Sequence, residues 1–347
     1  MATRARIAVL GASGYTGAET LRLALRHPDL EVRHITAERQ AGKAIGEVFP
    51  QLADQGLPTL VKIADVPFDA VDAVVCCLPH GTTQEVVAAL PTHLKVVDVS
   101  ADFRLADPQL YAQTYGRPHG APELQKEAVY GLTERAREAV RAARLVANPG
   151  CYPTGPLLAL EPLLHDQAIE PDGIVIDAKS GVSGAGRSAK ESLLFAEVNE
   201  GMHAYAIGSH RHLPEIEQGL SDAAGEAVRV SFTPHLVPMN RGILATIYVR
   251  FAAGADRGTL EQVLQESYAG EPFVRLRPAD HPPSTQEVRG TNLCAISVHD
   301  DRLHGHAVLV TVIDNLVKGA AGQALQNLNL MLGLEEPAGL GASALFP

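Results

Sequence analysis

One cysteine stands in a stretch rich in proline and glycine, NPGCYPTG, at residues 148 to 155. Proline fixes its own φ and disfavours a helical conformation in the residue before it, so this stretch predicts a helix that begins close to Cys151. A helix N-terminus has unpaired N–H groups and a positive partial charge, which favour the nucleophilic thiolate. Cys151 is therefore a candidate nucleophile. A buried cysteine in an ordinary turn is an equally good interpretation of this octet alone.

Two histidines in GSHRHLPEIEQ, at residues 208 to 218, could exchange protons with such a thiol. Histidine is the usual general acid–base near neutral pH. His210 and His212 would share a face of an extended strand, with Arg211 on the other face, whereas on a helix they would point apart. Only one of them is expected to reach Cys151, and we expect that group to titrate near neutrality. A structural histidine is the alternative.

A glycine-rich loop, GASGYTG at residues 11 to 17, follows an apolar strand pattern and precedes a helical one. Gly11, Gly14 and Gly17 would allow a tight turn and a close approach of a pyrophosphate to a helix N-terminus. The spacing departs from G-x-G-x-x-G, and a turn that binds no ligand is the alternative interpretation. We interpret the loop as a dinucleotide site.

Two further segments carry groups that could bind phosphate. In ITAERQAGK, residues 35 to 43, Glu38 could bind the ribose hydroxyls of NAD, and Arg39 the 2′-phosphate of NADP. The basic residues Arg39 and Lys43 favour NADP(H), the alternative being two solvated loop charges. KSGVSGAGRSAK, at 179 to 190, predicts an anion nest or else a flexible surface loop.

Together these groups define a reaction. A cysteine attacks an activated acyl group, a nicotinamide reduces the thioester, and a histidine transfers protons. Anion-binding groups would hold a phosphate leaving group and a substrate carboxylate.

The elements that position these groups fall into two patterns. Short apolar runs alternate with helical patterns up to residue 150, which predicts a parallel sheet covered on both faces. Longer β-rich runs follow at 173–181, 227–236, 242–251 and 306–314, which predict a mixed or antiparallel sheet. The chain becomes helical again at Asn315. The fold class is therefore α/β, with a Rossmann-type nucleotide-binding domain (residues 1–150 and 315–347) and an α+β catalytic and dimerisation domain (residues 151–314).

Composition excludes several classes of function. With 46% apolar and 20% charged residues the 347-residue chain is of ordinary globular composition, and a net charge of −11 argues against nucleic acid as a partner. We find no apolar run long enough to cross a membrane, and the start MATRARIAVLGASG leaves no room for a signal peptide. Four cysteines make no disulfide framework, which favours the cytoplasm. The cluster HRH lacks a matching second cluster, so we expect no metal.

The chain closely resembles the N-acetyl-gamma-glutamyl-phosphate reductases, arginine-pathway relatives of aspartate-semialdehyde dehydrogenase. The matching segments run nearly end to end and include GASGYTGAE, LPHG, DVSADFRL, NPGCYPT, KSGVSGAGR, HRHLPEIEQ and DNLVKGAAGQALQNLN. The resemblance implies NADPH-dependent reduction of an acyl phosphate, N-acetyl-L-glutamyl 5-phosphate, to the semialdehyde. It also implies a small-molecule substrate and a homodimer or homotetramer.

The resemblance also implies residue roles. Cys151 is the nucleophile and His210, the first histidine of HRHxPE, the acid–base. The implied cofactor contacts are Gly11, Ser13, Gly14, Tyr15, Thr16, Gly17, Ser183, Gly184 and Asn315, to which the charge pattern after the second strand adds Arg39. The expected substrate contacts are Arg104, Asn148, Arg211 and His212.

The segment RGTNLCAIS departs from the family pattern, because it lacks the aromatic and acidic residues often found there. The local role of residues 292 to 295 is therefore open. Lysine-pathway relatives that reduce an aminoadipyl phosphate share most motifs, but CYPTG favours the arginine-type substrate. A thiol hydrolase would not need GASGYTG, and a nucleotide-sensing protein would not need NPGCYPT.

Overall fold

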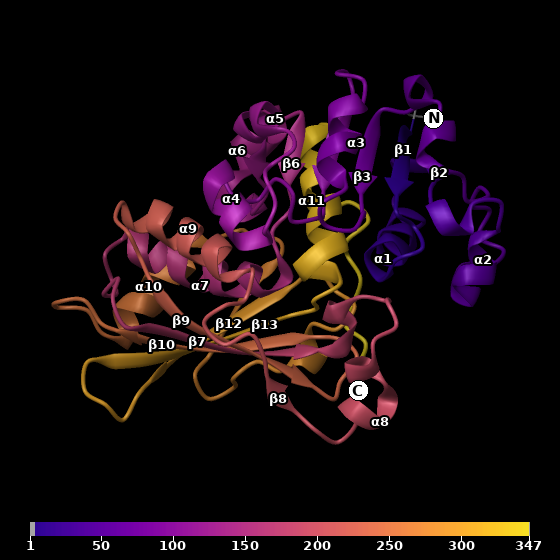
Figure 1. Cartoon of the computed structure of the whole chain (residues 1–347). Helices are drawn as coiled ribbons and strands as arrows, with labels where there is room; N and C mark the ends of the chain where they lie inside the picture. The colour runs from indigo at the N-terminus through magenta and orange to yellow at the C-terminus, as the bar shows by residue number, and fades with distance from the viewer. Residues whose placement is uncertain (1–3, 347) are drawn as a thin grey trace. The chain divides into compact units, whose positions relative to one another are not determined.

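The structure is a computed structural model that describes residues 4–346. The chain divides into two compact units, the first formed by Met1–Pro149 with Ala320–Ala342, and the second by Gly150–Gly319 with Ser343–Pro347. The chain thus returns to the first unit at Ala320, whereas the sequence pattern placed the return at Asn315. Figure 1 shows α11 (Gly322–Met331), in yellow, among the indigo and magenta elements of the first unit.

The first unit is built on a six-stranded, fully parallel sheet with the order β2-β1-β3-β4-β6-β5. Its central strands are buried along their length, as strands covered on both faces must be. The strands are β1 (Ala5–Leu10), β2 (Leu30–Ile35), β3 (Ala73–Cys76), β4 (Lys95–Asp98), β5 (Val129–Tyr130) and β6 (Leu145–Ala147). The helices are α1 (Tyr15–Ala24), α2 (Ile45–Val48), α3 (Thr83–Ala89), α4 (Pro108–Tyr115), α5 (Pro122–Glu127), α6 (Thr133–Ala142) and α11.

The strand order reverses between β1 and β3, since the chain passes from β2 across β1 to β3. Open parallel sheets bind ligands outside the carboxyl ends of their strands at such a point. Gly11 follows β1 there and Cys77 follows β3. The topology therefore places the predicted phosphate loop at the position where a Rossmann-type sheet binds a dinucleotide.

Helix α11 is anchored in the first unit by polar side chains that are fully buried. Asn327 donates to Gly131 O (2.8 Å) and to Asn148 Oδ1 (3.2 Å), and it accepts from Thr133 Oγ1 (2.6 Å). Gln323 donates to Gly131 O (3.1 Å). Unpaired polar groups are costly to bury, so these bonds fix the register of α11 against β5 and α6. Helix α11 also contacts α6, β4 and α1.

The second unit contains a seven-stranded mixed sheet with the order β11-β12-β13-β10-β7-β9-β8. The pairs β7·β9 and β11·β12 are parallel and the other neighbours antiparallel. The strands are β7 (Ile174–Gly181), β8 (His203–Ala204), β9 (Val230–Val237), β10 (Ile243–Arg250), β11 (Val274–Arg277), β12 (Cys294–Asp300) and β13 (His306–Ile313). The helices are α7 (Cys151–His165), α8 (Phe195–Val198), α9 (Leu213–Ala224) and α10 (Arg257–Ser267).

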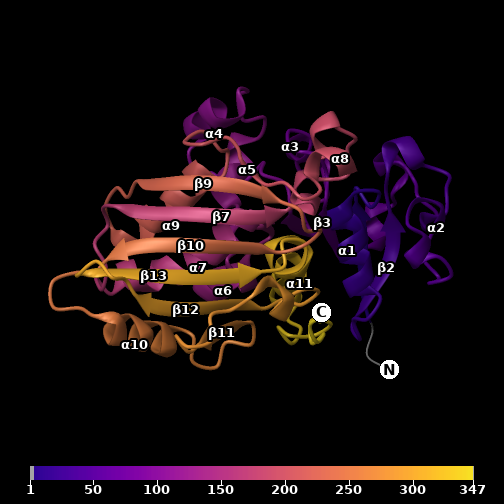
Figure 2. The same cartoon turned by 90° about the horizontal axis from the view of Figure 1, so that it is seen from below.

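One face of this sheet is covered by helices, as Figure 2 shows for α7 and α9 behind β7 and β10. Strand β10 alternates buried and more exposed residues, the pattern of a half-buried strand. The runs at 173–181, 227–236, 242–251 and 306–314 thus form strands as predicted. The short strands β5, β8 and β11 carry no such pattern and were not predicted.

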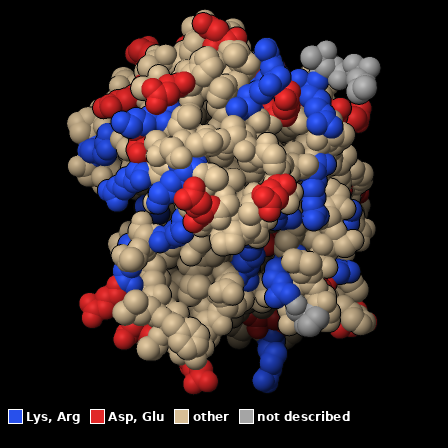
Figure 3. Space-filling model, turned by 90° about the vertical axis from the view of Figure 1, so that its right-hand side faces the viewer, with Lys and Arg blue, Asp and Glu red and all other residues tan. Residues whose placement is uncertain are grey.

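Acidic and basic side chains are interspersed on the face drawn in Figure 3. The net charge of −11 therefore does not produce a uniformly acidic surface on that face. No helix among the described residues is long and apolar enough to span a membrane.

Candidate functional site

The loop GASGYTG has the geometry that phosphate binding needs. Gly11 has a φ of +81°, and a Cβ there would lie 2.4 Å from Cys77 O. A Cβ at Gly17 would lie 2.5 Å from Gly11 O, so both positions require glycine. Gly14 is the N-cap of α1. A Cβ added there would have only Gly11 O nearby, at 3.6 Å. The first N–H groups of α1 are thus left approachable, which fits a pyrophosphate.

Three further predicted cofactor residues line the start of α1. Tyr15 is exposed and begins the helix, while Ser13 and Thr16 are half-buried. Their placement beside Gly14 follows directly from the chain path of the loop.

In the loop after β2, the two charged residues that could select between NAD and NADP have different surroundings. Glu38 Oε1 accepts a hydrogen bond from Ile63 N (3.0 Å), so this carboxylate is engaged with the protein. Arg39 is exposed, and within residues 4–346 its guanidinium has no ion pair. The arginine is therefore available to a ligand, whereas one oxygen of the Glu38 carboxylate already has a backbone partner.

Ser183, Gly184 and Asn315 come together in the second unit. Asn315 Nδ2 donates to Ser183 Oγ (2.9 Å), and Asn315 Oδ1 accepts from Gly242 N (2.8 Å). A Cβ at Gly184 would lie 3.1 Å from Ser180 Oγ and 3.7 Å from Asn315 Nδ2. Residues far apart in the chain therefore form one local cluster, and their shared contact with a cofactor stays a prediction.

Cys151 is the first residue of α7, as the proline and glycine pattern predicts. It is half-buried and, among the described residues, is not part of a disulfide. The residue before it, Gly150, is the N-cap, and its N–H donates to Glu215 Oε1 (2.7 Å). Pro153 falls in the first turn, where its missing N–H costs nothing. The thiol therefore lies at the positive end of a 15-residue helix.

The two histidines lie side by side in the turn that leads into α9. Their ring centroids are 4.9 Å apart, and Tyr152 contacts both rings, at 5.4 Å from His210 and 6.0 Å from His212. His212 N donates to His210 Nδ1 (3.1 Å). The segment is neither a strand nor a helix, so a turn, and not a shared strand face, brings the rings together.

Aromatic rings enclose His210. Tyr205 lies 5.5 Å and Phe232 5.5 Å from it, centroid to centroid. Burial, and secondly the charge of Arg211, lower the pKa of His210 to about 4. The imidazole is therefore neutral at pH 7, and our expectation of a group that titrates near neutrality is wrong for His210 in the protein alone. A neutral imidazole is the form that accepts a proton.

Arg211 and His212 differ in accessibility. Arg211 is exposed, close enough to lower the pKa of His210, whereas His212 is buried beside it. Arg104 and Asn148 are buried within the first unit, where Arg104 Nε donates to Asn148 O (2.8 Å) and Nη2 to Val99 O (2.9 Å). These bonds hold the backbone at the ends of β4 and β6. A contact of Arg104 or Asn148 with substrate stays a prediction.

Sequence reasoning missed Glu215 and the aromatic residues around His210. Glu215 is 1% exposed and links α9 to the backbone just before Cys151. The Tyr205 hydroxyl donates to the Tyr152 hydroxyl (3.1 Å), which donates to His235 O (3.2 Å). The position of Glu215 in the first turn of α9 predicts at most a bond to the start of its own helix, so no local signal indicated its bond to Gly150 N.

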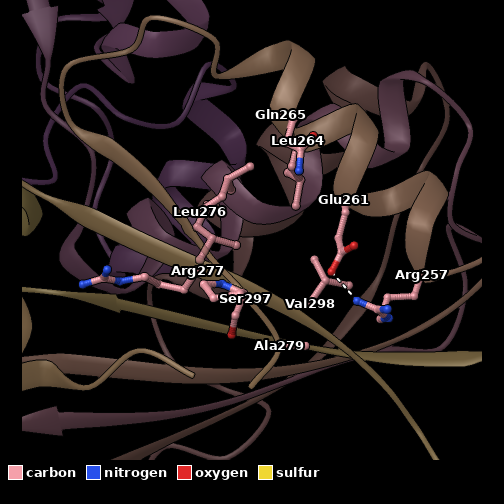
Figure 4. Close-up of a pocket in the computed structure, with 11 residues that line it drawn as sticks. Arg257, Glu261, Leu264, Gln265, Leu276, Arg277, Ala279, Ser297 and Val298 are labelled. Atoms are coloured by element: carbon pink, nitrogen blue, oxygen red, sulfur yellow. Dashed lines mark hydrogen bonds and ion pairs between the residues drawn. The ribbon is translucent and has the colours of Figure 1, made fainter. Parts of the chain in front are cut away.

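A separate pocket of about 350 Å³ lies between α10, β11 and β12 (Figure 4). Arg257 pairs with Glu261 there, as the dashed line in Figure 4 shows. Arg277 also lines it and pairs with Glu287. None of the residues that line this pocket belongs to the predicted site. Over residues 4–346 no group of three or more His, Cys, Asp or Glu side chains could hold a metal ion.

Comparison with known proteins defines both halves of the chain. Residues 6–143 match the family model "Semialdehyde dehydrogenase, NAD binding domain", and residues 151–315 match "Semialdehyde dehydrogenase, dimerisation domain". The solved structure of aspartate semialdehyde dehydrogenase II from Vibrio cholerae, complexed with ASA, has a TM-score of 0.72 at 18% identity. The alignment covers 96% of this chain and 99% of that chain. The fold and the domain matches define an oxidoreductase of the semialdehyde dehydrogenase class that uses a nicotinamide cofactor.

Two relatives narrow this class. The N-acetyl-gamma-glutamyl-phosphate reductase of Rhodospirillum rubrum is 56% identical over 352 residues, covering 100% of both chains. That of Afipia carboxidovorans is 55% identical over 350 residues, covering 99% of both. The chain belongs to the N-acetyl-gamma-glutamyl-phosphate reductase family, as the resemblance predicted.

The cause of the lowered pKa of His210 can be tested with Arg211→Ala. Removing this positive charge should raise the pKa of His210, but it should stay below the ordinary value of about 6.5, because burial is the larger cause. Proton NMR titration of the histidine ring signals measures this, with His210→Asn to assign the resonance. A wild-type pKa near 6.5, or no shift in Arg211→Ala, would contradict the assignment.

Proposed function

We propose that the chain catalyses the NADPH-dependent reductive dephosphorylation of N-acetyl-L-glutamyl 5-phosphate to N-acetyl-L-glutamate 5-semialdehyde, in arginine biosynthesis, through a thioester on Cys151. The observation that carries this proposal is the position of Cys151 at the start of α7, next to Tyr152, whose ring contacts His210 and His212. The names of the relatives supply the substrate.

The proposed first step forms the thioester. His210, neutral at pH 7, accepts the Cys151 proton, and the thiolate sulfur attacks the acyl carbon of the substrate. The bond between the acyl carbon and the phosphate oxygen breaks, and inorganic phosphate leaves. The N-terminus of α7 stabilises the negative charge on sulfur before the attack.

The proposed second step releases the aldehyde. NADPH, when bound, would supply the hydride that reduces the thioester carbon. His210, then protonated, donates to the developing alkoxide, and it takes the proton back as the C–S bond breaks and the thiolate is released. The aromatic rings around His210 exclude water and limit hydrolysis of the thioester.

We infer that the cofactor is held by backbone and side chains at the reversal of the first sheet and in the cluster of the second unit. Gly11 and Gly14 allow the pyrophosphate to approach α1, and Arg39 binds the 2′-phosphate of NADP(H). The remaining assigned contacts are Ser13, Tyr15, Thr16, Gly17, Ser183, Gly184 and Asn315. We propose the domain roles accordingly. The first unit, to which the sequence pattern assigned residues 1–150 and 315–347, is the NADP(H)-binding domain, and the second unit, to which it assigned residues 151–314, is the catalytic domain.

We propose that Arg211 binds the substrate carboxylate, because it is exposed and close to His210. His212 would support substrate binding through its packing against His210. Arg104 and Asn148 would contribute by holding the backbone that leads to residue 149.

We further infer a homodimer or homotetramer formed through the sheet face of the second unit that α7, α9 and α10 leave uncovered. Val175 and Tyr248 are cross-strand neighbours on that face, and they are 36% and 40% exposed. Val308 of β13 is the cross-strand neighbour of Tyr248 on its other side. Sedimentation equilibrium measures the assembly, and a monomer at micromolar concentration would contradict this inference.

Cys151→Ser should fold, bind NADPH and lose nearly all reductase activity, because a serine hydroxyl is a far weaker nucleophile without a strong base. Phosphate-dependent reduction of NADP⁺ by the semialdehyde, the reverse reaction, measures turnover. The assay should also compare glutamyl and aminoadipyl phosphates in the forward direction. Substantial turnover in Cys151→Ser would remove Cys151 from the mechanism, and preference for the aminoadipyl compound would change the substrate.

His210→Asn should lower kcat by about 10²–10⁴, with folding and cofactor binding intact. Since the pKa of His210 is about 4, the acid limb of the kcat/KM profile should lie well below neutrality and be lost in the variant. The matched variant His212→Asn should act mainly on KM or stability. A larger kcat loss in His212→Asn than in His210→Asn would reverse the assignment.

Arg39→Ala should weaken NADPH binding while leaving NADH binding nearly unchanged. Losing a charge-assisted contact costs on the order of 1.5–3 kcal/mol, or roughly tenfold to over a hundredfold in affinity. Titration of cofactor fluorescence measures both dissociation constants, with Arg33→Ala on the exposed side of β2 as control. An unchanged preference for NADPH would show that Arg39 is not the selector.

A further inference from the structure

Gly319 packs directly against Cys151 in the second unit. It lies in the π-helical turn η8 (Val317–Ala321), which follows β13 and precedes α11. A Cβ at Gly319 would lie 2.8 Å from Cys151 Cβ, 3.2 Å from Cys151 Cα and 3.3 Å from Ile313 Cδ1. Carbon atoms in contact are normally about 3.5–4.0 Å apart. Any side chain at this position must therefore displace a neighbour.

The backbone that carries Gly319 is fixed by a buried carboxylate. Asp314 is fully buried, and it accepts hydrogen bonds from Leu316 N (2.8 Å), Val317 N (3.2 Å) and Gly290 N (2.7 Å). Gly319 N donates to Asp314 O (3.0 Å), which closes the π-turn. The turn therefore cannot move away from α7 without breaking several buried hydrogen bonds, each costly to lose.

The same segment also contains Asn315, which is bonded to Ser183 and to Gly242 N. Both of these neighbours belong to the second unit. The segment from 314 to 319 is thus fixed at its start by Asp314 and Asn315, and it contacts the thiol residue at its end. Single π-turns are rare and occur frequently at functional sites.

We propose that Gly319 is a positioning residue for Cys151, whose missing side chain sets the depth at which the thiol lies at the N-terminus of α7. This inference rests on the proposed function, because the proposed function assigns the Cys151 thiol as the nucleophile. A methyl group here would push the Cβ of Cys151 outward. The electrostatic effect of a helix N-terminus falls off within one turn. Such a shift therefore changes both the direction in which the thiol points and its acidity.

The test is Gly319→Ala, with two readouts. The rate of alkylation of Cys151 by iodoacetamide, followed against pH by peptide mapping, should change its apparent midpoint. A misplacement near 1 Å costs on the order of 10²-fold in rate, so kcat should fall by about 10- to 100-fold with NADPH affinity retained. Cys77 interferes little, because burial raises the pKa of its thiol to about 12.

The matched control is Gly219→Ala in α9. A Cβ there would lie 2.8 Å from Leu157 Cδ2 and 3.0 Å from Glu161 Oε1, a contact at a similar distance but to side-chain ends of α7 beyond its first turn. It should lower Tm and leave the alkylation profile unchanged. If Gly319→Ala does not fold, Ile313→Val in the same chain removes the Cδ1 atom and relieves that contact alone.

A folded Gly319→Ala protein, or its Ile313→Val double variant, with the wild-type alkylation profile would overturn the proposal. An equal change in Gly219→Ala would do the same. An altered profile in Gly319→Ala, together with no reductase turnover in the wild type, would support the positioning role and contradict the proposed function. The two proposals are thereby tested separately.

Discussion

The start of α7 is the constraint on which the second unit depends. The N–H of Gly150 is taken by the buried carboxylate of Glu215, which ties the backbone before Cys151 to α9 and so to the histidine turn. A charge-assisted bond of this kind is stronger and more directional than a neutral one. Because α7 is buried along almost its whole length, the position of this one terminus is set by packing on every side.

Close backbone approach is the second recurring feature. At Gly11, Gly17 and Gly319 a Cβ would lie between 2.4 and 2.8 Å from another atom. Gly11 and Gly17 allow the proposed phosphate loop to pack closely, against Cys77 O and Gly11 O, and Gly319 packs against the thiol residue. The glycines are therefore packing requirements at a site as well as sources of conformational freedom.

Burial determines the protonation state of the histidine turn. Aromatic rings surround His210 and keep water from its ring. Burial disfavours the charged imidazolium, so the pKa of His210 falls to about 4. Arg211 adds to this shift. A substrate phosphate would act in the opposite direction, because a negative charge favours the protonated ring. A bound substrate would therefore make the ring a stronger base for the Cys151 proton than it is in the protein alone.

The sequence by itself determined the features that depend on neighbours along the chain. Alternating apolar runs predicted the two sheets, the pattern of proline and glycine placed Cys151 in the first turn of α7, and GASGYTG predicted the loop between β1 and α1. Only the tertiary structure decided which distant groups meet, such as Gly150 with Glu215, Cys151 with Gly319, and Asn315 with Ser183. It also decided the pKa of His210, because residues from three separate segments exclude water there. Local periodicity follows from the geometry of the backbone, whereas burial and long-range contacts exist only once the chain is packed.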